Sequence, residues 1–65
     1  MKYSKQDFLE AISKLERINP RASFWIREDY KAVEQFIVSQ IMSIDNAEIE
    51  FDRLTEETLE ELSKI

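Results

Sequence analysis

The chain contains no glycine and a single proline, Pro20, among its 65 residues. Glycine offers the least costly route to the left-handed backbone of tight β-hairpins, so its absence disfavours an all-β fold. The sequence instead predicts helices joined by Asn, Asp and Ser turns. A chain of this length makes one domain, residues 1–65, and is near the lower limit for a core that is stable alone.

The first predicted helix runs from Ser4 to about Ile18. Asp7 follows Ser4 by three residues, which makes an approximate capping box, and Tyr3 and Phe8 flank this cap at the positions of a hydrophobic staple. Apolar residues then recur every three or four positions, as on one face of a helix.

The second predicted helix begins directly after Asn19, because asparagine is a favoured cap and proline suits the first helical position. Its apolar stripe continues to Ile44, which makes it the long central helix. An alternative places an irregular turn at residues 24–27 and begins this helix at Glu28.

Residues 47–52 alternate apolar and acidic side chains, which is the period of a β-strand. A short extended connector is therefore predicted before the last helix, for which Thr55 would be the cap. Leu59, Leu62 and Ile65 would form the buried side of that helix. The predicted fold is all-α, with three helices.

The composition excludes most catalytic chemistry. The chain has no His and no Cys, so the commonest general base, the commonest metal ligand and the thiol nucleophile are missing. Asp45 and Glu56 have the separation of the first and last ligands of a calcium loop, but Ala47 and Ile49 occupy ligand positions and Glu50 occupies the position of the turn glycine. We therefore predict a protein that is not an enzyme and needs no cofactor or metal.

Charge is distributed unevenly. Residues 1–33 hold seven bases and five acids, whereas residues 34–65 hold two bases and nine acids. A nucleic-acid-binding protein presents a basic surface to phosphates, so direct nucleic-acid binding is not expected. No apolar run is long enough for a signal peptide or a membrane span, so we expect a soluble cytoplasmic protein.

The acidic second half favours a small acidic protein-interaction module or regulator that binds a basic or basic-apolar surface of a protein partner, with a homodimer as one form. Its alternating segment would accept a partner strand. Trp25 either covers the small core or belongs to an interface, and Phe36, Val38 and Met42 belong either to the core or to a dimer seam. The candidate protein-binding residues are Glu48, Ile49, Glu50, Phe51, Asp52, Glu56, Glu60, Phe24 and Trp25.

The segment "IEFDRLTEETLEEL", residues 49–62, resembles the end of the extra-terminal domain of bromodomain-type chromatin proteins. The pattern F-x-x-L-x-x-x-x-L-x-x-L of that domain is matched by Phe51, Leu54, Leu59 and Leu62. The resemblance implies binding of peptides with alternating basic and apolar residues by strand addition.

Two other functions fit the size and charge of the chain. The acids could imitate the phosphates of nucleic acid, as in inhibitors encoded by phages and mobile elements. The chain could also be a small structural subunit whose core is completed by a partner.

Overall fold

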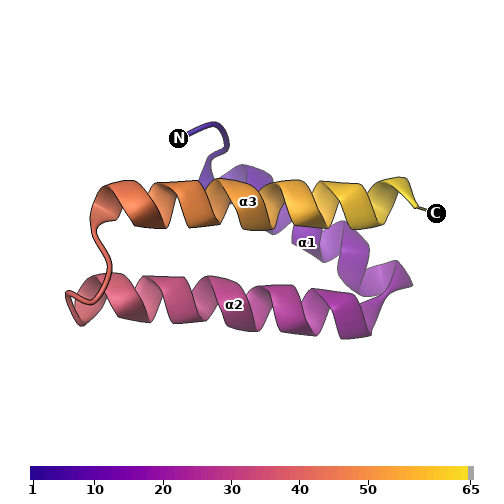
Figure 1. Cartoon of the computed structure of the whole chain (residues 1–65). Helices are drawn as coiled ribbons and strands as arrows, with labels where there is room; N and C mark the ends of the chain where they lie inside the picture. Colours follow the sequence, from indigo (N-terminus) through magenta and orange to yellow (C-terminus); the bar gives the residue numbers. More distant parts are fainter. Residues whose placement is uncertain (65) are drawn as a thin grey trace.

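The computed structural model describes residues 1–64 and contains three helices: α1 (Lys5–Ile18), α2 (Pro20–Val38) and α3 (Ile44–Ser63). Figure 1 shows α2 and α3 side by side in opposite directions, with α1 crossing behind them. Each helix contacts the other two. The predicted all-α fold of three helices is confirmed, and no strand occurs within residues 1–64. Ile65, predicted to be buried, lies outside the described residues.

The capping box at the start of α1 is confirmed. The Asp7 backbone N–H donates to the Ser4 hydroxyl at 3.1 Å, and the Ser4 N–H donates to the Asp7 carboxylate at 3.0 Å. The side chain of each residue thus satisfies an amide that the helix leaves unpaired.

One residue, Asn19, joins α1 to α2. Its N–H donates to the Leu15 carbonyl at 2.7 Å, and its side-chain oxygen accepts from the Ala22 N–H at 3.2 Å. Pro20 occupies the first position of α2, where it removes no hydrogen bond. The helix continues without a break through residues 24–27, so the continuous form of the prediction is confirmed.

The α2 helix ends at Val38, earlier than the predicted Ile44. Gln40 adopts the left-handed conformation, with φ at 59°. Its N–H donates to the Ile37 carbonyl at 3.0 Å, and the Ile41 N–H donates to the Phe36 carbonyl at 2.9 Å. These two bonds form a Schellman motif, which closes the helix even though the apolar sequence pattern continues.

The connector before α3 is short, as predicted, but it consists of residues 39–43. Residues 47–52 are helical, so the prediction of an extended segment there is wrong. Ser43 is the cap of α3, since its hydroxyl accepts from the Asn46 N–H at 3.2 Å. Ala47 and Phe51 are also one helical turn apart, so the apolar alternation that indicated a strand fits a helix equally well. Ala47 is buried, whereas Ile49, which lies between them in sequence, is 65% exposed.

Thr55 is not a cap, contrary to the prediction. It is buried in the middle of α3, and its hydroxyl donates to the Phe51 carbonyl at 2.9 Å; Thr58 donates in the same way to the Leu54 carbonyl at 2.8 Å. A threonine hydroxyl can donate a hydrogen bond to a backbone carbonyl of the preceding helical turn. It can therefore be buried without a partner from another element. Leu62 is half-buried against the core, as the prediction of a buried side requires. Leu59 was also predicted to be buried, but it is exposed.

The core is organised around three stacked aromatic rings, one from each helix. The Tyr30 ring of α2 lies between Phe8 of α1, at 4.0 Å between ring centroids, and Phe51 of α3, at 4.5 Å. Burial raises the pKa of the Tyr30 hydroxyl, because ionisation is disfavoured away from water. Buried aliphatic residues surround the rings: Ile12, Leu15, Ile26, Val33, Ala47 and Leu54.

We predict that Gln40→Gly raises the free energy of unfolding by about 0.5–1 kcal/mol. The left-handed conformation costs a residue with a Cβ about 1–2 kcal/mol, and the greater freedom of glycine in the unfolded chain offsets part of the gain. Chemical denaturation measures the change. Ser39→Gly is the control, because Ser39 has an ordinary φ of −80° and its replacement should lower stability. Equal losses in the two variants would contradict the assignment of a left-handed cap.

Candidate functional site

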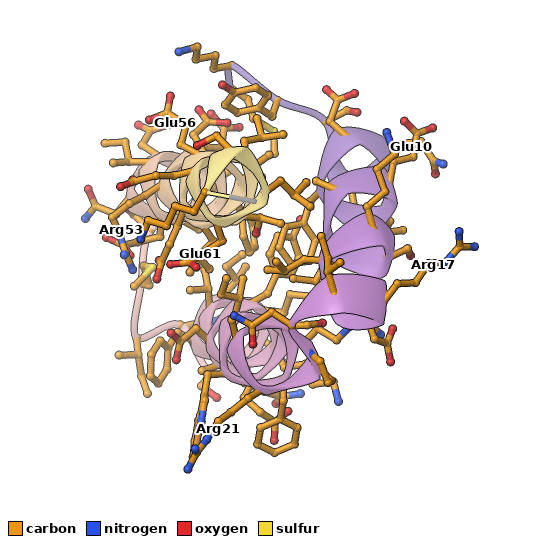
Figure 2. The ribbon with its side chains drawn as sticks, turned by 90° about the vertical axis from the view of Figure 1, so that its right-hand side faces the viewer. Glu10, Arg17, Arg21, Arg53, Glu56 and Glu61 are labelled. Carbon is orange, nitrogen blue, oxygen red and sulfur yellow. The ribbon has the colours of Figure 1, made fainter. Side chains whose placement is uncertain are left out.

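The outward side of α3 carries an exposed stripe whose members are three or four residues apart. We call this stripe the outer face of α3. Figure 2 shows Arg53 and Glu56 projecting from α3 away from α1. Ile49, at 65% exposure, is the apolar member of the stripe. The outer face of α3 comprises Asp45, Ile49, Arg53, Glu56 and Glu60.

Two acids of α3 neutralise the base at the centre of this face. Arg53 donates to the Glu50 carboxylate through Nη2 at 2.8 Å and Nε at 3.0 Å, and to Glu57 at 3.4 Å. The hydrogen bonds to Glu50, together with the nearby negative charges, raise the pKa of the Arg53 guanidinium. Glu50, a predicted binding residue, therefore has a partner within its own helix.

The residues that precede α1 bind another acid of α3 through their backbone. Asp52 accepts the Lys2 backbone N–H at 2.8 Å and the Tyr3 N–H at 2.9 Å, one on each carboxylate oxygen. These bonds to backbone amides lower the pKa of Asp52, because they favour its charged form. The predicted binding residue Asp52 thus fastens the first residues of the chain to α3.

Neighbouring charges reinforce this attachment. The Lys2 ammonium lies 2.9 Å from the Glu56 carboxylate, which raises the pKa of Lys2 through their hydrogen bond, and the terminal ammonium of Met1 lies 3.9 Å from Glu48. These pairs lie at the surface, where water and salt screen them, and such pairs contribute little to stability. Glu48 and Glu56 could therefore exchange their partners for a stronger one.

The remaining predicted binding residues lie in different parts of the molecule and do not form one surface. Phe51 points into the core, where it stacks on Tyr30. Phe24 and Trp25 are exposed near the start of α2, with their rings 5.2 Å apart in an edge-to-face arrangement, so Trp25 does not cover the core. Ile49 and Glu60 keep the exposed positions that a binding role requires.

The sequence interpretation named Phe24 and Trp25 as binding residues but missed the exposed bases beside them, where α1 meets α2. Lys14, Arg17 and Arg21 have no ion pair within residues 1–64, whereas each of the other six bases has one. A sequence shows where bases occur but not which of them have a carboxylate nearby. We call this group the basic corner, and it comprises Lys14, Arg17, Ile18, Arg21, Phe24 and Trp25.

A second group is apolar, and the sequence interpretation had named only Val38 and Phe36 of it, as residues of the core or of a dimer seam. Val38, Ile41 and Ile44 are all exposed at the connector between α2 and α3, with Ile41 at 73%. Phe36 nearby is also exposed, whereas Met42 packs against the core. An unbroken apolar pattern had placed Ile41 and Ile44 on a longer helix, where their exposure was not expected.

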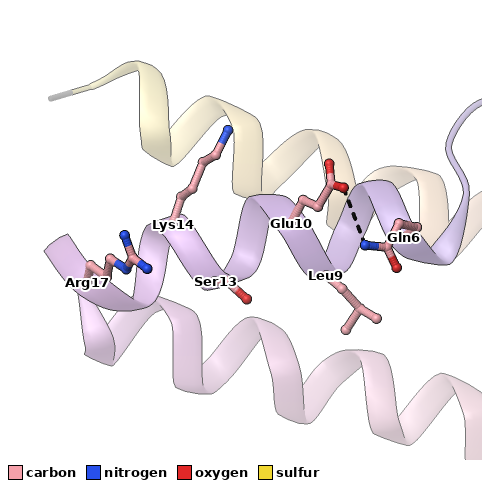
Figure 3. A pocket seen from close by; sticks show the side chains of 6 residues that line it. All are labelled: Gln6, Leu9, Glu10, Ser13, Lys14 and Arg17. Atoms are coloured by element: carbon pink, nitrogen blue, oxygen red, sulfur yellow. Dashed lines mark hydrogen bonds between the residues drawn. The ribbon is translucent and has the colours of Figure 1, made fainter.

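Hollows in the surface are shallow. Figure 3 shows one of about 520 Å³, in which Gln6 donates to Glu10 at 3.3 Å. All six residues that line it come from α1, so no facing element helps to enclose a ligand. Another hollow, of about 460 Å³, lies between α1 and α3 and includes Leu59 and Leu62. Within residues 1–64, no three acidic side chains converge on a position that could hold a metal ion.

None of the helices described in residues 1–64 has both the length and the apolar character needed to cross a membrane. No protein-family model, curated protein or solved structure matches this chain. The segment that resembles an extra-terminal domain is helical from residue 49 onward, so its backbone groups are bonded within α3. Strand addition at residues 47–52, which the resemblance implied, is therefore excluded in this fold.

We predict that Asp52→Asn lowers the thermal midpoint at pH 7, because the amide carries no charge and offers one oxygen to two N–H donors. The lowered pKa of Asp52 stabilises the fold above the ordinary value of 3.8, and this contribution is lost as the pH falls below that value. The difference between wild type and variant should therefore shrink between pH 5 and pH 3. Circular dichroism measures both midpoints.

Glu60→Gln is the matched control, since Glu60 has no ion pair within residues 1–64. It should leave the midpoint at pH 7 nearly unchanged. A deficit for Asp52→Asn that stays constant down to pH 3 would contradict a role for the Asp52 charge.

Proposed function

We propose that this chain is a small non-enzymatic protein-interaction module that binds a basic-apolar surface of a protein partner through the outer face of α3. The observation that supports this proposal is the exposure of Ile49, at 65%, on a helix face that also carries Asp45, Glu56 and Glu60. Apolar residues exposed beside charges are typical of the centre and rim of protein interfaces. A cytoplasmic location is part of the proposal.

Binding would use side chains rather than the backbone. Residues of a helix bind a groove through positions three or four apart, and Ile49 would be the apolar anchor in such a groove. Asp45 and Glu60, which have no ion pair within residues 1–64, would meet Lys or Arg of the partner on either side of it. Glu56 would exchange its exposed pair with Lys2 for a base of the partner.

Mimicry of nucleic acid has less support. A mimic needs a row of carboxylates that are free to replace phosphates, whereas Asp52 holds backbone N–H groups and both Glu50 and Glu57 hold Arg53. Arg53 also interrupts the row with a positive charge. The arrangement therefore favours a protein partner whose surface combines apolar and basic groups.

One observation favours a second function, that of a small subunit in a larger complex. Val38, Ile41 and Ile44 are exposed together at the α2–α3 connector. Exposed apolar groups of this kind commonly mark protein-protein contacts. In this alternative, a neighbouring subunit would cover the connector, and the outer face of α3 would remain in water.

A synthetic amphipathic helix of lysine and leucine is the probe that tests the first function. Titrated into the labelled protein, it should shift the NMR amide signals of the outer face of α3. Ile49→Ser should weaken binding about tenfold, because burial of an exposed isoleucine contributes roughly 1.5 kcal/mol.

Leu9→Ser is the matched control, because Leu9 is also an exposed apolar residue but lies on α1. It should bind the peptide like wild type. Equal weakening by the two variants, or signal shifts confined to the α2–α3 connector, would contradict binding by the outer face of α3.

A further inference from the structure

The chain itself carries a surface of the kind that the outer face of α3 would bind. The basic corner combines exposed bases with exposed apolar rings, and Trp25 is 61% exposed. Figure 2 looks onto this end of the molecule, where Arg17 projects from α1 and Arg21 projects from α2 on different sides. Trp and Arg are the residues most enriched where binding energy concentrates in interfaces.

Within residues 1–64, no acid forms an ion pair with a base of the basic corner, although the chain has many acids. The chain holds 14 acids and 9 bases, yet three bases in succession, Lys14, Arg17 and Arg21, have no ion pair within residues 1–64. No acid lies in the first turn of α2, where Arg21 stands and where the helix dipole is positive. The positive potential at this corner therefore favours an acidic partner.

We infer that the basic corner of one copy docks on the outer face of α3 of a second copy. This inference rests on the proposed function, because it names the partner of the same surface. Phe24 and Trp25 would cover Ile49, while Arg21, one helical turn before them on α2, would meet Glu56. The contact thus joins apolar groups at its centre and opposite charges around them.

The two surfaces are different patches of one molecule, so the contact is heterologous. Arg21 lies on a different side of the molecule from Glu56 (Figure 2), which leaves both surfaces of one copy accessible at once. Association is therefore head-to-tail and continues beyond two copies as the concentration rises. Because each copy has a net charge of −5, moderate salt near 0.1 M is needed to screen the general repulsion.

Sedimentation equilibrium over a concentration series tests the inference. The mass of the wild type should rise above the 7.8 kDa of one chain. The emission of Trp25, the only tryptophan, should move to shorter wavelength as the ring leaves water. A wild type that remains at 7.8 kDa at millimolar concentration would overturn the inference.

Two charge-reversed variants identify the surfaces. Arg17→Glu with Arg21→Glu alters the basic corner, and Glu56→Lys with Glu60→Lys alters the outer face of α3. Each double variant alone should associate at least about tenfold more weakly, a loss of roughly 1.4 kcal/mol, because its two surfaces carry the same charge. An equimolar mixture should regain association, since the reversed charges again attract.

Lys5→Glu with Lys31→Glu is the matched control, because it reverses two exposed charges of α1 and α2 outside both surfaces. It should associate like wild type. Association that survives both reversals would overturn the inference and indicate another surface. A monomeric wild type that still binds the lysine-leucine peptide overturns this inference alone, whereas loss of both binding events overturns the proposed function as well.

Discussion

The stack of Phe8, Tyr30 and Phe51 is the interaction on which the rest of the structure depends. It is made of one ring from each helix, with Tyr30 of α2 in the middle. The chain has no cysteine that could add a disulfide, and so small a domain relies on its few large buried side chains. Stacked rings also restrict rotation of the helices, because each ring must stay aligned with its neighbour.

This restriction determines what α3 presents to water. With Phe51 directed inward, the residues two positions away in either direction, Ile49 and Arg53, lie on the opposite side of the helix. The same helix therefore completes the core and exposes an apolar residue among acids. Six of its eight acids have a partner within residues 1–64, among them Asp52, which holds the backbone of Lys2 and Tyr3, and Glu50, which holds Arg53. Asp45 and Glu60 have no such partner and are available to another molecule.

Local signals in the sequence were sufficient to predict where α1 begins and where α2 follows it. The capping pair of Ser4 and Asp7 and the Asn19–Pro20 junction each act within four residues, so their geometry follows from residue type. The start of α3 was predicted wrongly, although Ser43 caps it through the Asn46 N–H in the same local way. Ala47, Ile49 and Phe51 satisfy a strand period, while Ala47, Phe51 and Leu54 satisfy a helical one, and the packing of this second set against the core fits the helix. The pairing of Asp52 with the start of the chain spans some 50 residues, and no local pattern indicates it.

The candidate surfaces were predictable only in part, for a related reason. Exposed Ile49 and Glu60 were among the expected binding residues, but the sequence could not indicate that Glu50 and Asp52 have internal partners. Nor could it indicate that Lys14, Arg17 and Arg21 have none within residues 1–64. The net charge of a segment is a property of its sequence, whereas its unpaired charge depends on the neighbours that folding provides.

The free energies of unfolding of Phe51→Ala and Ile49→Ala, measured side by side by chemical denaturation, test the central claim most directly. A helical α3 with Phe51 in the stack predicts a loss on the order of 3 kcal/mol, or an unfolded chain, for Phe51→Ala. It predicts a change within about 0.5 kcal/mol for Ile49→Ala. In an extended segment these two residues share one face and would be buried or exposed together. Similar losses from the two substitutions would therefore contradict the account.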